Sequence, residues 1–275
     1  MNRYKRVVLS LVGLAVPTML VAQASDWPKV LVITREVVKP AKNRAHTKNE
    51  VAWARASEAA KYPDTYLAMN AMSGANESWF IWGYPSMAGW ETMNRAGEGN
   101  AALTAVDERY GGADADLLNN IATTVAELRA DLSYDNERPV TSCRYMSVVR
   151  VSVKIGHLQD FAEARRMTKA AAEKSKAPQW MAVYQVAAGA PQGTFLVMSC
   201  QKSLAELDAD AEGPAFVDAL GGPDAAKKLA DLRASFQNSV DFQYFSFAPQ
   251  MSVVPKEWGD ADPYWKPKAA PKKTP

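Results

Sequence analysis

A short motif that occurs twice places the strongest constraint on the fold of this 275-residue chain. Gly-Gly-x-Asp-Ala begins at Gly111 and again at Gly221, 110 residues later. The flanking sequence matches at a similar spacing, and Arg35 and Arg150 lie 115 residues apart. Further pairs at that spacing are Lys39 with Lys154, Asn70 with Gln185, Gly74 with Gly189, and Phe80 with Phe195. Ordered matches of this kind indicate an internal repeat, so the sequence predicts one module used twice.

The repeated motif follows a helical pattern in each half. We expect Gly111-Gly112 and Gly221-Gly222 to end one helix, as glycine commonly does at helix C-termini. Asp114 and Asp224 stand where a carboxylate favours the start of the next helix. The motif has no third glycine and follows no strand, which excludes a dinucleotide-binding loop.

Both halves give the same order of strand and helix patterns. A β-branched run at 29–38 predicts a strand, and the pattern at 43–61 predicts a helix. A predicted hairpin at 65–84 and helical pieces up to Tyr110 complete the first series. The second series runs from 144 to 247. Thr123–Arg129 looks helical by composition, but its counterpart in the second series is a predicted strand, so we predict a strand there. The predicted fold is therefore α+β, with two tandem ferredoxin-like β-α-β-β-α-β modules.

This duplicated order resembles the dimeric α/β-barrel superfamily over about residues 28–255. That superfamily includes antibiotic-biosynthesis monooxygenase-like, EthD-like and NIPSNAP-like proteins. The resemblance implies that two four-stranded sheets pack face to face into a barrel with helices outside. Single-domain members form the barrel as a homodimer. Here either an intrachain pseudo-dimer or a homodimer satisfies the pattern.

The amino terminus has the three parts of a secretory signal peptide. Basic residues at 3, 5 and 6 precede an apolar run at 7–21, and Ala22-Gln23-Ala24 is an A-x-A cleavage site. We assign 1–24 to a signal peptide, 25–137 to module 1, 138–256 to module 2 and 257–275 to a disordered basic tail. We expect an exported protein, periplasmic or secreted, with no stable membrane span after cleavage.

Charge and motif content exclude several partners. The net charge is +2 and no basic stripe is visible, so nucleic acid is not an expected partner. No His/Asp/Glu group has ligand spacing, so no metal and no cofactor is predicted. The two histidines, His46 and His157, stand near helix starts, and haem binding through either is the weakest alternative.

The two cysteines are candidates for a disulfide. In a ferredoxin-like sheet the first and third strands are antiparallel neighbours. Cys143 begins the first strand of module 2 and Cys200 ends the third, so the two are expected to meet. Two separate buried thiols are the alternative.

The matched pairs and the aromatic side chains supply the candidate ligand-binding residues. Period-two alternation places Arg35 and Arg150 on apolar strand faces, where they either bind a carboxylate inside the barrel or pair with a local acid. Asn70 and Gln185 are matched amides that can bond a ligand or the backbone. Aromatic side chains suited to a flat apolar ligand, or to an ordinary core, are Trp79, Trp82, Tyr84, Trp180 and Tyr184.

Three functions remain open from the sequence. The first is non-catalytic binding of a small apolar or carboxylate-bearing ligand in the barrel. The second is a cofactor-independent monooxygenase-like or isomerase-like enzyme, as the resemblance implies. The third is a haem binder. One scaffold hosts many functions, so the fold does not choose among them.

Overall fold

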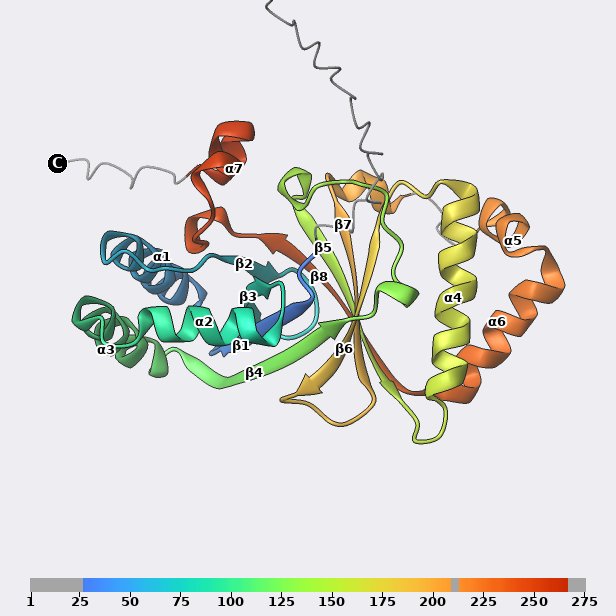
Figure 1. Cartoon of the computed structure of the whole chain (residues 1–275), viewed down its shortest axis with the longest axis horizontal. Helices are drawn as coiled ribbons and strands as arrows, with labels where there is room; N and C mark the ends of the chain where they lie inside the picture. Colours follow the sequence, from blue (N-terminus) through green and yellow to red (C-terminus); the bar gives the residue numbers. More distant parts are fainter. Residues whose placement is uncertain (1–26, 209–212, 267–275) are drawn as a thin grey trace, which may run out of the picture.

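Eight antiparallel strands form a closed barrel in the computed structural model, which describes residues 27–208 and 213–266 (Figure 1). The first half contains β1 (Val30–Val38), α1 (Asn43–Ala59), β2 (Tyr66–Ala71), β3 (Glu77–Tyr84), α2 (Met87–Gly97), α3 (Ala101–Ala115) and β4 (Leu118–Leu128). The second contains β5 (Tyr145–Val153), α4 (Leu158–Ser175), β6 (Met181–Ala188), β7 (Thr194–Gln201), α5 (Pro214–Leu220), α6 (Pro223–Phe236) and β8 (Gln237–Phe247), and α7 (Lys256–Ala261) follows. The predicted α+β class and barrel are confirmed, including the strand at Thr123–Arg129, which β4 contains up to Leu128. The predicted signal peptide at 1–24 lies outside the described residues.

The strand order around the barrel is β1-β3-β2-β8-β5-β7-β6-β4. β4 pairs with β1 of its own half and with β6 of the other half. β8 likewise pairs with β5 and crosses to β2. Barrel closure therefore takes place within one chain.

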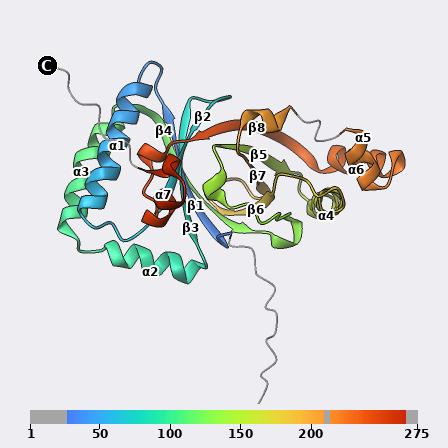
Figure 2. The same cartoon turned by 90° about the horizontal axis from the view of Figure 1, so that it is seen from above.

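Alternate strand residues face the barrel interior. One apolar cluster takes members from all eight strands at alternate positions, including Ile33, Met69, Ala126, Val148 and Phe245. The opposite faces pack under helices: α1, α2 and α3 lie on one side of the barrel and α4, α5 and α6 on the other, in both views (Figures 1 and 2).

The glycine motif behaves differently in the two halves. Gly221 ends α5 with a left-handed φ of 112°, and α6 begins at Pro223, as predicted. Gly111-Gly112 instead lies inside α3, so the prediction of a helix end there is wrong. Asp114 consequently stands in the last turn of α3 and is buried, rather than starting a new helix. Residues that pack around this turn, rather than local propensity, decide the outcome.

The carboxy-terminal segment folds over one end of the barrel. Trp265 is 1% exposed and its indole N–H donates to Thr141 O at 2.6 Å. Tyr264 donates to Phe247 O at 2.9 Å, and Arg144 pairs with Asp262. The expected disordered tail at 257–275 is thus ordered through its first residues, because two tryptophans and an ion pair hold it; residues 267–275 lie outside the described residues.

Cys143 and Cys200 form a disulfide with a Cα–Cα distance of 5.7 Å. The pairing of β5 with β7 places Met146 opposite Cys200, which brings the two cysteines together at one end of the barrel, as the antiparallel arrangement predicts.

We expect the purified protein to contain no free thiol before reduction and two after it, measured with a thiol reagent in denaturant. Replacing both cysteines with alanine should cost about 4 kcal/mol of unfolding free energy, because the bridge closes a 57-residue loop. Equal thiol counts before and after reduction would contradict the bridge.

Candidate functional site

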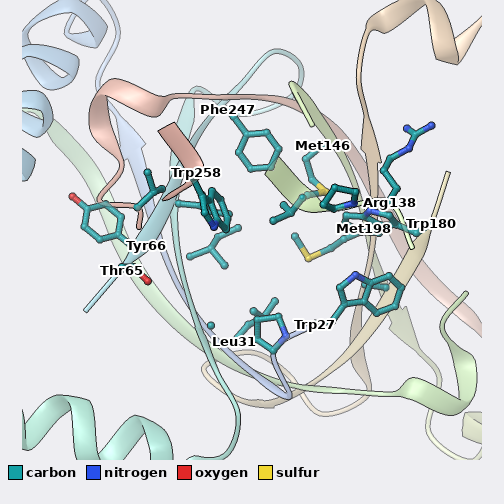
Figure 3. A pocket seen from close by; sticks show the side chains of 18 of the residues that line it. Trp27, Leu31, Thr65, Tyr66, Arg138, Met146, Trp180, Met198, Phe247 and Trp258 are labelled. Atoms are coloured by element: carbon teal, nitrogen blue, oxygen red, sulfur yellow. The ribbon is translucent and has the colours of Figure 1, made fainter. Parts of the chain in front are cut away.

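A cavity of about 590 Å³ opens at the end of the barrel that the carboxy-terminal segment covers. Figure 3 shows the labelled side chains of Trp27, Leu31, Met198 and Phe247 arranged around it. The strands contribute apolar side chains to the wall, and the segments at 135–140 and 253–258 form much of the rim. A concave, mainly apolar volume of this size suits a small organic molecule.

Few polar groups reach this cavity. The Tyr184 hydroxyl donates to Pro28 O at 2.9 Å, and burial raises the pKa of this phenol above its ordinary value, so it stays protonated at neutral pH. The indole N–H of Trp180 is buried without a partner, and the ring packs on Trp27 with centroids 5.2 Å apart. At the rim, Arg138 is paired with Glu206 at 2.7 Å. The cavity therefore offers mainly aromatic and apolar surface, and its carboxylates, Asp135 and Glu137, are exposed residues of the segment at 135–140.

Arg35 and Arg150 line a second cavity of about 180 Å³, formed by a separate set of residues that includes the loop at 189–191. Their inward orientation agrees with the alternation that the sequence predicts. Each is already paired: Arg35 with Glu77 at 2.7 Å and Arg150 with Asp241 at 2.7 Å. From the sequence, acids close to each arginine along the chain were the expected partners. The acids that pair with Arg35 and Arg150 lie instead on the neighbouring strands β3 and β8, and their distance along the chain does not reveal this.

The two arginine pairs differ in burial. The Glu77 side chain is fully buried, and the Arg35 guanidinium also lies 5.0 Å from the Trp79 ring. The Arg150 pair is half-exposed. Arg35 Nε and Trp79 Nε1 are buried and have no hydrogen-bond partner, so the smaller cavity has two free donors at its wall.

Four other predicted ligand residues lie on the outer faces of their strands. Asn70 accepts from the Ser78 hydroxyl at 2.7 Å, and Gln185 accepts from Arg129 at 3.1 Å. Trp82 packs under α1 and α2 and donates to the Tyr62 hydroxyl at 3.0 Å. The Tyr84 hydroxyl donates to Asp64. None of Asn70, Trp82, Tyr84 and Gln185 lines either cavity described here.

The histidines occupy different environments. His157 is partly exposed at the start of α4 and is 2.8 Å from Asp160. His46 is 1% exposed, and its Nε2 lies 2.8 Å from Glu36 and 3.9 Å from Asp114. Neither histidine lines one of the two cavities.

His46 belongs to a buried polar cluster beneath α1. Glu36, His46, Glu50 and Asp114 each offer one ligand atom, and these four atoms all lie within 4.8 Å of one another. Burial, reinforced by Glu36 and then Asp114, raises the pKa of Glu50 to about 9, and burial beside Glu36 raises the pKa of Asp114 to about 6. The sequence analysis missed this cluster. The four-residue spacing of His46 and Glu50, one helical turn apart, was its only local signal.

No helix in the described part of the chain has the length and apolar character needed to cross a membrane.

Comparison with known proteins identifies the fold and nothing finer. No protein-family model and no curated protein matches the sequence. An anthrone oxidase-like protein shares 13% identity with a TM-score of 0.54, covering 80% of this chain and 91% of that chain. A proposed monooxygenase from Lactobacillus acidophilus shares 9% identity with a TM-score of 0.52, covering 84% of this chain and 100% of that chain. A proposed monooxygenase from Fusobacterium nucleatum shares 9% identity with a TM-score of 0.53, covering 82% of this chain and 94% of that chain. These similarities are to the fold alone, and they agree with the predicted α+β barrel.

We expect the two arginine pairs to differ in their contribution to stability. Glu77→Ala should lower the unfolding free energy by about 3 kcal/mol, because it leaves the mostly buried Arg35 unpaired. Asp241→Ala should cost less than about 1 kcal/mol, because its pair with Arg150 is half-exposed. Urea unfolding of both variants measures the difference, and equal losses would contradict it.

Proposed function

We propose that this chain is an exported protein that binds a flat, apolar small molecule in the 590 Å³ cavity, without catalysis. The cavity itself carries this proposal, because it is large, mainly apolar and lined by aromatic side chains at a barrel mouth, where ligands of this kind bind. Trp27 and Trp180 offer ring faces for stacking on a flat ligand, and the free indole N–H of Trp180 can donate one hydrogen bond.

The polar groups of the cavity favour binding over turnover. A general base needs a pKa near the working pH and an open path to substrate. Tyr184 has a raised pKa and already donates to the backbone, so it supports the wall instead of abstracting a proton. Arg138 is held by Glu206 at the rim. The carboxylates that line the cavity, Asp135 and Glu137, are exposed to water, so the cavity holds no buried acid–base pair.

An apolar ligand fits better than a carboxylate-bearing one. Arg35 and Arg150, the predicted carboxylate-binding residues, line the smaller cavity of about 180 Å³. Each already has a carboxylate partner, which a ligand would have to displace. Haem binding through histidine has no support, because His46 and His157 both lie away from the larger cavity.

A cofactor-independent oxygenase is the second candidate, and the fold shared with the two proposed monooxygenases and the anthrone oxidase-like protein favours it over an isomerase. This is an analogy between scaffolds, and identities of 9–13% carry no residue roles.

We also infer that the chain is a tandem duplication of one ferredoxin-like module, acting as an intrachain pseudo-dimer. β1 and β5 begin 115 residues apart, as do α1 and α4, which supports this origin. Because the barrel closes within one chain, a monomer suffices for the cavity.

Ligand binding can be tested with the neutral flat fluorophore 1-aminoanthracene. We expect saturable fluorescence enhancement with one site per chain. Ala182→Phe should weaken binding at least tenfold, because residue 182 lines the cavity and a phenyl group fills part of it. Ala187→Phe is the matched control, on the exposed face of the same strand.

Equal affinity of the two variants would place binding elsewhere and contradict the proposal. Oxygen uptake with anthrone, absent in Ala182→Phe and present in Ala187→Phe, would instead establish the oxygenase alternative at the same cavity.

Export has its own test. When the chain is expressed in a bacterium with residues 1–24 included, we expect the protein in the periplasmic or culture fraction. Its intact mass should match a chain that begins at Ser25, because Ala22-Gln23-Ala24 ends the predicted signal peptide. A cytoplasmic protein that retains residues 1–24 would contradict export.

A further inference from the structure

The buried cluster of Glu36, His46, Glu50 and Asp114 joins three elements that are distant in the sequence. Glu36 points outward from β1, His46 and Glu50 share one face of α1, and Asp114 lies in the last turn of α3. All four residues are between 1% and 8% exposed. Three carboxylates and one imidazole are therefore held together away from water, beneath the helices and outside the barrel cavity.

The charge of this cluster is not balanced by the protein. Among residues 27–208 and 213–266, no lysine or arginine forms an ion pair with any of the three carboxylates. With all three carboxylates ionised, even a protonated His46 leaves a formal excess of two negative charges, which either a proton on Glu50, whose pKa is raised to about 9, or a bound cation would reduce. Burying a charge without a partner costs folding free energy, so a bound cation would stabilise the ionised cluster.

Hydrogen bonding to Glu50 is weak. Glu50 is 7% exposed, and among the described residues the only donor to its carboxylate is Asn49 Nδ2, at 3.4 Å. The same amide nitrogen also approaches Tyr110 O at 3.0 Å and Asp114 Oδ1 at 3.3 Å. An amide group has two hydrogens for these three acceptors. Glu50 is therefore a buried carboxylate with a single weak donor, and one of its oxygens lies within 4.8 Å of the other three ligand atoms.

At the corresponding places in the second half, apolar residues replace Glu36 and His46, and Arg165 replaces Glu50 as the eighth residue of its helix. Glu36 is the seventh residue of β1 and Val151 the seventh of β5; His46 and Phe161 are both fourth in their helices. Val151 and Phe161 pack in one apolar cluster with Leu229. The strand–helix contact thus forms in the second half without a carboxylate or a histidine, so the fold alone does not require this cluster.

We propose that Glu36, His46, Glu50 and Asp114 bind one divalent transition-metal ion, such as Zn²⁺ or Mn²⁺, that fastens α1 and α3 to the barrel. A tetrahedral site with bonds of about 2.1 Å places its ligand atoms about 3.4 Å apart. His46 Nε2 lies 2.8 Å from Glu36 and 3.9 Å from Asp114, which brackets that spacing. One imidazole with three carboxylates is a donor set for Zn²⁺, Mn²⁺ or Fe²⁺ rather than for the all-oxygen coordination of Ca²⁺.

The test uses the chain expressed from its full coding sequence, unfolded in chelator and refolded with Zn²⁺ or Mn²⁺ separately. We expect one equivalent of at least one of these ions per chain after gel filtration, measured by plasma mass spectrometry, and a higher melting temperature than in the ion-free protein. Glu50→Gln and His46→Gln should each weaken binding at least 100-fold. Glu58→Gln, an exposed residue of the same helix, should leave binding unchanged.

Circular dichroism establishes that each variant folds, so loss of the ion is separated from loss of structure. The outcome that overturns the proposal is wild-type protein that retains neither ion while Glu50→Gln is as stable as wild type or more so. That result would mean that a proton on Glu50 balances the cluster. Equal ion content in wild type and all three variants would show adventitious binding and would also overturn it.

Discussion

The rest of the structure depends on two long strands, β4 and β8, each of which pairs with a strand of the other half of the molecule. β4 and β8 each contain eleven residues, and each pairs with one strand of its own half and one of the other. This leaves no open edge that could pair with another chain. It also fixes which side chains face inward, since a shift of one residue would exchange the two faces of a strand. Both cavities are consequences of that register.

The two ends of the barrel differ in the polarity of the side chains that line their cavities. At one end the disulfide, the Arg144–Asp262 pair and Trp265 hold the chain in place around an apolar cavity. At the other end Arg35 and Arg150 face a smaller space and are neutralised across neighbouring strands. A ligand that needs apolar contact and one that needs charge would therefore bind at separate places.

Local periodicity predicted much of this fold, because strand alternation and helix repeats are properties of short windows. Strand alternation placed Arg35 and Arg150 on the inward face, and the expected ferredoxin-like strand order brought Cys143 to Cys200. Local periodicity did not reveal that Glu77 and Asp241 neutralise the arginines, since those contacts depend on strand register. The inward and outward faces of β3 were also ambiguous from sequence: Trp79 and Trp82 are both aromatic, yet only Trp79 enters the barrel. Asp114 was misplaced because the same five-residue motif folds differently in each half.

The glycine pair inside α3 gives this half of the molecule a weak point. Two glycines in a helix interior cost about 2 kcal/mol relative to alanine, so the turn that carries Asp114 has little intrinsic tendency to stay helical. Its order must come from what Asp114 and its neighbours contact. Local opening of a helix end requires far less free energy than global unfolding. The last turn of α3 is thus expected to open more readily than the barrel, and such opening would expose Asp114 to water while the strands and their ligand cavity remain intact.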